Sequence, residues 1–211
     1  MTITDHWWWR PGWRPGRRMY TWHATFADLP AVRDLAAQAQ ARLAGLPGLD
    51  LVPAQWLHLT MQGIGFTDEV PDADLAALVD ATRRHLADAE PPRVRIGPAR
   101  VASEGVLLGV APVDGLTKVR DGLRAAIAET WPTAAVPEPA EWMPHISVAY
   151  SRVTGPAAPY EAALSGDTAT AEAVIRSVQL IVLGRDEHVY RWASHATVRL
   201  PAATGQPSGS G

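Results

Sequence analysis

Two short segments of the same pattern constrain the fold of this chain more than any other feature. A His, an aliphatic residue, and a Thr or Ser stand between apolar neighbours at His58-Leu59-Thr60 and again at His145-Ile146-Ser147. In an extended strand, residues i and i+2 point to the same side and lie roughly 6 to 7 Å apart. Each segment is therefore predicted to be a strand that buries its apolar residues and presents one imidazole and one hydroxyl on its other face.

The same tripeptide occurs twice more, at His23-Ala24-Thr25 and at His195-Ala196-Thr197, so the context must decide which pair is functional. The copies at His58 and His145 share a lead of Val and Pro followed by Trp: Val52, Pro53 and Trp56 in the first, Val136, Pro137 and Trp142 in the second. The other two copies lack this lead and have Ala between the His and the hydroxyl. The repeated context favours His58 and His145 and indicates an internal duplication, while His23 and His195 remain candidates for the wall of a cleft.

Two such strands facing each other would place two imidazoles and two hydroxyls around a space suited to a phosphate group. Cleavage of a phosphodiester needs a base that takes a proton from the attacking water or hydroxyl, and an acid that protonates the leaving oxygen. One neutral and one protonated imidazole near pH 7 supply both groups, and the sequence does not assign the two roles. Histidines that only hydrogen-bond to nearby hydroxyls are the structural alternative. A metal centre is disfavoured, because no Asp, Glu or His stands at ligand spacing from either motif and the chain has no cysteine.

With these motifs 87 positions apart, residues 19–200 resemble the two-histidine (2H) phosphoesterase superfamily, which includes 2'-5' RNA ligase-like proteins and cyclic phosphodiesterases. The resemblance implies that His58 and His145 are the acid and the base, and that no cofactor or metal takes part. It also implies that Thr60 and Ser147 donate hydrogen bonds to non-bridging phosphate oxygens, which stabilises the charge of the transition state. Many members of the family carry an Arg soon after the second motif, where this chain has Ala149-Tyr150-Ser151-Arg152.

Several residues near the motifs are predicted to bind substrate. Gln62 and Ser151 lie on the motif faces if the strands stay extended, and Tyr150 and Arg152 follow the second motif. Four aromatic residues stand at i, i+2 spacing on the predicted first and last strands: Tyr20, Trp22, Tyr190 and Trp192. They either stack on a nucleobase or pack in the core. If the strands are regular, these aromatic residues and His23 lie on opposite faces, so only one of the two sets faces the groove.

The coarse order of elements indicates an α+β fold in which strand, helix, motif strand and helix occur once in each half. The predicted strands are 19–26, 56–66, 93–102, 106–112, 145–150, 174–184 and 188–200. The predicted helices cover 30–46, with Asp28 as the cap, then segments that begin at Asp72 and Asp114, and finally 159–164. We therefore expect a bilobed, duplicated unit over 19–200, with two antiparallel sheets facing a central groove and helices on the outside.

The ends of the chain differ from this pattern. Residues 1–18 contain Trp7, Trp8, Trp9 and Trp13 among Arg, Pro and Gly. Exposed, these rings would promote aggregation, so the segment is expected to pack on something: either it contacts a nucleotide by stacking and charge, or it forms a belt over the outside of one lobe. Residues 201–211 are rich in Ser, Gly and Pro and are predicted to be a disordered tail. The basic residues selected as candidates for phosphate contact are Arg17, Arg18, Arg152 and Arg185.

Composition limits the class of partner. The chain has 211 residues and a net charge of −3, which disfavours a broad basic surface for long nucleic acids, so a nucleotide or short RNA is the expected ligand. No run of 18 apolar residues and no signal peptide stand in the sequence, which predicts a cytoplasmic protein that does not enter the membrane. A monomer is expected.

Three functions fit these observations. The first is a metal-independent phosphodiesterase that hydrolyses a 2',3'-cyclic phosphate or a 2'-5' linked nucleotide. The second, from the same family, is a 2'-5' RNA ligase or RNA end-processing enzyme. The third is a non-catalytic module that binds a nucleotide or a phosphorylated metabolite. A small non-nucleotide phosphodiester also remains open as a substrate.

Overall fold

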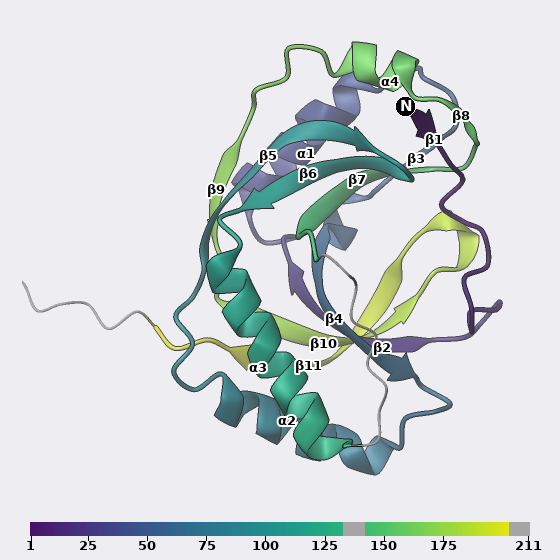
Figure 1. Cartoon of the computed structure of the whole chain (residues 1–211). Helices are drawn as coiled ribbons and strands as arrows, with labels where there is room; N and C mark the ends of the chain where they lie inside the picture. Colours follow the sequence, from purple (N-terminus) through teal and green to yellow (C-terminus); the bar gives the residue numbers. More distant parts are fainter. Residues whose placement is uncertain (133–141, 203–211) are drawn as a thin grey trace, which may run out of the picture.

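The computed structural model describes residues 1–132 and 142–202, and two antiparallel sheets form its centre. One sheet has the strand order β11-β10-β2-β4 and consists of Arg191–Arg199, Ser177–Gly184, Met19–Thr25 and His58–Phe66. The other has the order β3-β7-β6-β5-β9 and consists of Leu49–Leu51, His145–Ser151, Gly105–Ala111, Arg93–Ala102 and Ala171–Val174. In Figure 1 the five-stranded sheet lies above the four-stranded sheet. The motif strands β4 and β7 are in contact where the two sheets meet.

Two helices follow a strand of one sheet and pack on elements of the other. α1 (Pro30–Arg42) follows β2 of the four-stranded sheet but packs on β9, β7 and β5. α3 (Asp114–Thr130) connects β6 to β7 of the five-stranded sheet, yet it packs on α2 (Asp72–His85) and on β4. The short α4 (Ala158–Ala163) contacts β5. Because α1 and α3 each pack on elements of the other sheet, they hold the two sheets together. α2 and α3 lie on the outside of the molecule in Figure 1.

The helical faces with apolar spacing in the sequence are buried. Leu116, Val119, Leu123 and Ile127 of α3 are each at most 1% exposed. Their i, i+3, i+4 spacing places them on one side of the helix. Burying an aliphatic side chain of this size stabilises a protein by about 1.5 to 3 kcal/mol, which is larger than any single capping contribution to such a helix. Packing of this stripe therefore explains why α3 forms without a side-chain cap.

The α+β class, with two antiparallel sheets and helices outside, is confirmed, whereas several boundaries differ from the prediction. α1 ends at Arg42, and its N-cap is Leu29 without a side-chain hydrogen bond, so Asp28 does not cap the helix. The predicted strand 174–184 is two strands, β9 and β10, because the chain crosses between the sheets at Ile175-Arg176. β3 was not predicted, since it has only three residues and forms by pairing with β7.

The N-terminal segment, residues 1–18, runs from one sheet to the other, and not over the outside of one lobe. β1 (Thr2–Ile3) pairs with β8 (Gly155–Pro156), and the N–H of His6 donates to the carbonyl of Ser151 at the end of β7. Further along, the N–H of Gly16 donates to the carboxylate of Asp186, next to the four-stranded sheet. The segment, dark purple in Figure 1, therefore bridges the two lobes.

The tryptophans of this segment are covered unequally. Trp7 is 8% exposed and packs against the rings of Tyr150, Tyr190 and His188. Trp13 meets the ring of Phe66 edge-on. Trp8 and Trp9 remain 48% and 51% exposed. The segment therefore packs Trp7 and Trp13 against the domain, and Trp8, although half exposed, donates a hydrogen bond from its indole to Glu104.

Three further expectations concern the ends and the surroundings of the domain. No helix within the described ranges is long and apolar enough to cross a membrane. The predicted tail 201–211 lies outside the described residues from position 203 onward. The Val136-Pro137 lead of the second motif also lies outside them.

Candidate active site

The backbone holds both motif histidines in the same way. The Nδ1 atom of His58 lies 2.8 Å from the carbonyl oxygen of Trp56, and the Nδ1 atom of His145 lies 2.9 Å from that of Met143. Because a carbonyl oxygen only accepts, Nδ1 carries the hydrogen and donates it. Each neutral ring is thereby fixed with Nε2 unprotonated, and Nε2 is the nitrogen left for chemistry.

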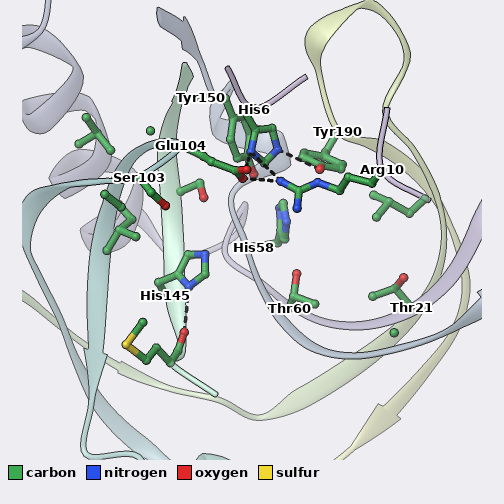
Figure 2. A pocket seen from close by; sticks show the side chains of 18 of the residues that line it. His6, Arg10, Thr21, His58, Thr60, Ser103, Glu104, His145, Tyr150 and Tyr190 are labelled. Atoms are coloured by element: carbon green, nitrogen blue, oxygen red, sulfur yellow. Dashed lines mark hydrogen bonds and ion pairs between the residues drawn. The ribbon is translucent and has the colours of Figure 1, made fainter. Parts of the chain in front are cut away.

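Both histidines line one pocket of about 600 Å³. Thr60 and Ser147 also line it, so the structure brings the four residues proposed for catalysis to one place. Figure 2 shows the rings of His58 and His145 entering the pocket from different strands, with Thr60 below His58. A pocket of this size is typical of sites for ligands as large as a nucleotide.

A β-bulge after the first motif changes which residues face the pocket. In its pairing with β2, β4 has one extra residue, Met61, between Thr60 and Gln62. An extra residue reverses the alternation of faces, so the next residue in the pocket is Gly63. The prediction that Gln62 lines the groove is therefore wrong: Gln62 is 5% exposed, and its amide oxygen accepts a hydrogen bond from Arg124 of α3.

The second motif strand has a bulge at the matching position. In its pairing with β6, β7 has an extra residue, Val148, directly after Ser147. The pocket therefore contains Tyr150, as expected, but not Ser151. Ser151 is fully buried outside the pocket, and its hydroxyl donates to the carbonyl of Val153.

The aromatic residues of β2 belong to the core. Trp22 is 0% exposed and Tyr20 is 6% exposed, and neither lines the pocket, which corrects their selection as substrate contacts. The opposite face of β2 carries Thr21, which lines the pocket. Of the two later aromatic residues, Tyr190 lines the pocket, while Trp192 packs edge-on against His58 at 5.2 Å between ring centroids.

The side chain of His58 is buried among other rings. Its ring stacks on that of His23, with centroids 4.3 Å apart and planes at 5°, and Trp192 and Tyr190 meet it edge-on. Burial lowers the pKa of His58 to about 4, the positive charge of His145 acts in the same direction, and the carbonyl of Trp56 opposes the shift. His58 is therefore neutral at pH 7. Burial, together with His58, also holds the pKa of His23 well below 6.5.

The two motif hydroxyls have different partners. Thr60 Oγ1 lies 3.3 Å from Nε2 of His23, a ring that is itself completely buried. Ser147 is half-buried and forms a side-chain hydrogen bond with Tyr150, whose pKa is raised by burial. His23 was a reserve candidate for the cleft wall, and it lies behind that wall, beneath the ring of the first motif histidine. His195, the other reserve residue, is exposed on β11 and outside the pocket.

The N-terminal segment closes one end of the pocket through His6, a residue that no sequence pattern indicated. Burial lowers the pKa of His6 to about 4, with a further contribution from Arg10, so the ring is neutral at pH 7. Its Nδ1 lies 3.0 Å from Glu104 Oε2, and its Nε2 lies 2.9 Å from the hydroxyl of Tyr190. Since a carboxylate only accepts, Nδ1–H donates to Glu104 and the Tyr190 hydroxyl donates to Nε2. The chain of hydrogen bonds crosses from one lobe to the other, as Figure 2 shows.

The arginines selected from the sequence do not line the pocket. Arg17 and Arg18 form ion pairs with acidic side chains outside it. Arg185 is 3% exposed and donates to the carbonyl of His6, and Arg152 lies at the surface near Asp50. The structure therefore does not place Arg152 with the motif residues, since it follows the last residue of β7 and lies outside the pocket. The arginines that do line the pocket are Arg10 and Arg100.

Comparisons with known proteins agree with this geometry. The family model of the 2'-5' RNA ligase superfamily matches residues 26–187. The chain belongs to this superfamily. Among solved structures, TT0787 of Thermus thermophilus superposes with a TM-score of 0.66 at 21% identity, covering 88% of this chain and 99% of its own. E. coli LigT in complex with NADP+ gives 0.62 at 19% identity, covering 87% and 98%.

More distant relatives keep the same architecture. The phosphodiesterase domain of MHV ns2 has a TM-score of 0.53 at 13% identity and covers 79% of this chain and 99% of its own. No curated protein sequence matches the chain. The segment that closes the pocket at His6 and Arg10 lies outside the residues that the family model matches. Within the described residues, no three His, Asp or Glu side chains converge as a set of metal ligands.

Proposed function

We propose that this protein is a metal-independent phosphodiesterase that acts on a 2',3'-cyclic phosphate or a 2'-5' linkage in a nucleotide or short RNA. The observation that carries the proposal is the pair of imidazoles in one pocket, each with Nδ1 bound to a carbonyl and each accompanied by a hydroxyl two residues later. Two fixed Nε2 atoms supply the base and the acid that cleavage of a phosphodiester requires.

The different surroundings of the two rings support one assignment of the roles. His58 is neutral at pH 7 because its pKa is about 4, so it acts as the base and takes a proton from the attacking water. His145, exposed at the start of β7, is then the partner that acts as the acid and protonates the leaving oxygen. Thr60 and Ser147 donate hydrogen bonds to the non-bridging oxygens. In the reverse, ligating direction the two histidines exchange roles.

The substrate class rests on the pocket and on the relatives. The volume of about 600 Å³ accommodates a nucleotide, and both an aromatic wall and two arginines border it. E. coli LigT, at 16 to 19% identity, has been crystallised with 3'-AMP, ATP, NADP+ and phosphate. These ligands support a nucleotide as the partner of this chain.

A direct assay tests the proposal. The full chain is incubated with 2',3'-cyclic AMP, a 2'-5' linked dinucleotide and its 3'-5' isomer, with EDTA present, and the products are separated by chromatography. We expect turnover of the first two substrates and none by the variant that carries both His58→Ala and His145→Ala. Equal activity of that double variant would assign the turnover to a contaminant. Binding of the nucleotides without turnover by the wild type would select the non-catalytic module.

A further inference from the structure

Arg100 is a cation on the wall of the pocket without a partner among the described residues. It lies on β5, is exposed and lines the same pocket as the two motif histidines. No hydrogen bond, ion pair or ring contact engages its guanidinium within residues 1–132 and 142–202. An arginine that stabilises the fold would be expected to have such a partner, since its five N–H groups otherwise bind only water.

The strand pairing places Arg100 in line with the second motif. Arg100 is opposite Leu107 on β6, and Leu107 is opposite Ser147 on β7, so these three residues form one row across the sheet. Neighbouring strands are about 4.8 Å apart, so the backbone of Arg100 lies about 10 Å from that of Ser147. Arg100 therefore stands beyond the reacting centre, farther from the junction of the two sheets.

The side chain folds back toward that centre over a glycine. The Cζ atom of Arg100 lies 4.0 Å from the point where a Cβ on Gly109 would stand. Gly109 pairs with His145 across β6 and β7. The guanidinium of Arg100 therefore lies beside Gly109, one strand away from His145.

The other pocket arginine is in a different situation. Arg10 binds the carboxylate of Glu104, and its Nη2 atom lies 3.5 Å from Nδ1 of His6. Its charge is therefore balanced within the protein before any ligand enters. Arg100 keeps its full charge for a ligand, and a guanidinium matches the geometry of a phosphate by two parallel hydrogen bonds.

We propose that Arg100 forms a second phosphate subsite, which binds a phosphate group of the substrate other than the one that reacts at His58 and His145. This proposal rests on the proposed function for the position of the reacting phosphate. The ligands that it favours are nucleotides with two separate phosphates, such as a 2'-5' linked oligonucleotide or a cyclic nucleotide with a terminal phosphate. A nucleotide with a single phosphate occupies the histidine centre and leaves Arg100 solvated.

Calorimetric titration of the intact chain with two stable probes tests the proposal without relying on turnover. The probes are adenosine 3'-monophosphate and adenosine 3',5'-bisphosphate, at fixed ionic strength because phosphate affinity depends on salt. The wild type is expected to bind the bisphosphate about tenfold or more tightly than the monophosphate, the effect of one hydrogen-bonded charge pair. Arg100→Gln should lose this difference and keep its affinity for the monophosphate within about twofold, while Arg100→Lys retains part of it.

Arg93→Gln is the matched control, because Arg93 is exposed on the same strand but does not line the pocket. It should bind both probes like the wild type. The subsite is ruled out when Arg100→Gln keeps the preference for the bisphosphate, or when Arg93→Gln loses it equally. Failure of the wild type to bind either probe rules out the subsite, while the turnover assay with the cyclic and 2'-5' linked substrates decides the proposed function separately. Loss of the preference in Arg100→Gln, in a protein that cleaves none of the phosphodiesters tested, keeps the subsite and overturns only the hydrolase.

Discussion

The two motif strands share one backbone design and differ in what surrounds it. In both, the histidine donates from Nδ1 to the carbonyl two residues earlier, the hydroxyl follows two residues later, and a bulge comes directly after the hydroxyl. Yet His58 is 9% exposed and stacked on another imidazole, whereas His145 is exposed to solvent. The motif therefore fixes which atoms reach the pocket, while burial distinguishes the ring of His58 from that of His145.

This difference explains how a repeated motif can support an asymmetric reaction. Acid and base catalysis needs two groups whose proton affinities differ, and an exact repeat of one environment would give two equal groups. Packing by His23, Trp192 and Tyr190 removes water from one ring only. Burial deprives the charged form of that ring of its hydration, which keeps the ring neutral at pH 7 and therefore able to accept a proton.

Removing either imidazole is expected to have the largest effect. His58→Ala and His145→Ala should each lower kcat/KM for 2',3'-cyclic AMP by roughly 10²- to 10⁴-fold, the usual contribution of a positioned acid or base. A nucleoside p-nitrophenyl phosphodiester separates the roles, because p-nitrophenolate leaves without a proton. With this substrate His145→Ala should recover most of its activity and His58→Ala should not. Recovery by His58→Ala instead would reverse the assignment of acid and base.

Removing either motif hydroxyl is expected to have the next largest effect on activity. Thr60→Val and Ser147→Ala each remove one donor to the phosphate oxygens, and a loss of about a hundredfold in kcat is expected. The control variant carries His195→Asn and Thr197→Val, which destroy the same tripeptide on β11 outside the pocket. If this control has the kinetics of the wild type, the tripeptide alone does not create a site, and its place in the pocket is what matters. A loss in kcat no greater than that of the control would show that the hydroxyls do not contact the reacting phosphate.

The sequence determined the motif strands because their evidence is local. Alternation of apolar and polar residues around His58 and His145 identifies a half-buried strand without any knowledge of its partners. The bulges at Met61 and Val148 arise only when β4 pairs with β2 and β7 with β6. Residues beyond each bulge, such as Gln62, were therefore assigned to the wrong face.

Features that depend on contacts between distant segments were not predictable for the same reason. An apolar stripe shows that a helix is half-buried but not which sheet covers it, so the exchange of α1 and α3 between the lobes was not expected. His6 reaches the pocket only because its partners, Glu104 and Tyr190, lie 98 and 184 positions away. Arg100 becomes a pocket residue through the face that β5 presents, which the sequence of that strand alone does not specify.

The pH dependence of activity tests the difference between the two motif histidines. His58 must be neutral to act as the base, so activity should rise with pH as this ring loses its proton, with a midpoint near its pKa of about 4. Below that pH, kcat/KM should fall about tenfold per pH unit. The falling limb at higher pH reports the acid, and in His145→Ala with the p-nitrophenyl substrate it should disappear while the limb near pH 4 remains. A rising limb with a midpoint near 6.5 would show that His58 is not the buried base.

The smallest expected effect is on the free energy of unfolding. It tests the contribution of His23 separately from those of the two motif histidines. Burial holds the pKa of His23 well below 6.5 in the folded protein. At pH values between this lowered pKa and 6.5, the unfolded chain therefore binds a proton at His23 that the folded chain does not. The contribution of His23 to the free energy of unfolding is therefore complete above pH 6.5. It decreases as the pH falls below 6.5, by about 1.4 kcal/mol per pH unit for each such group. Within the described residues, Nδ1 of His23 has no hydrogen-bond partner, so His23→Phe removes one hydrogen bond, to Thr60, and keeps a planar ring next to His58. In urea titrations this variant should gain stability relative to wild type as the pH is lowered from 7 to 5. His195→Phe, at the exposed copy of the tripeptide, should show no such change, and an equal pH dependence in both variants would mean that His23 is protonated in the fold.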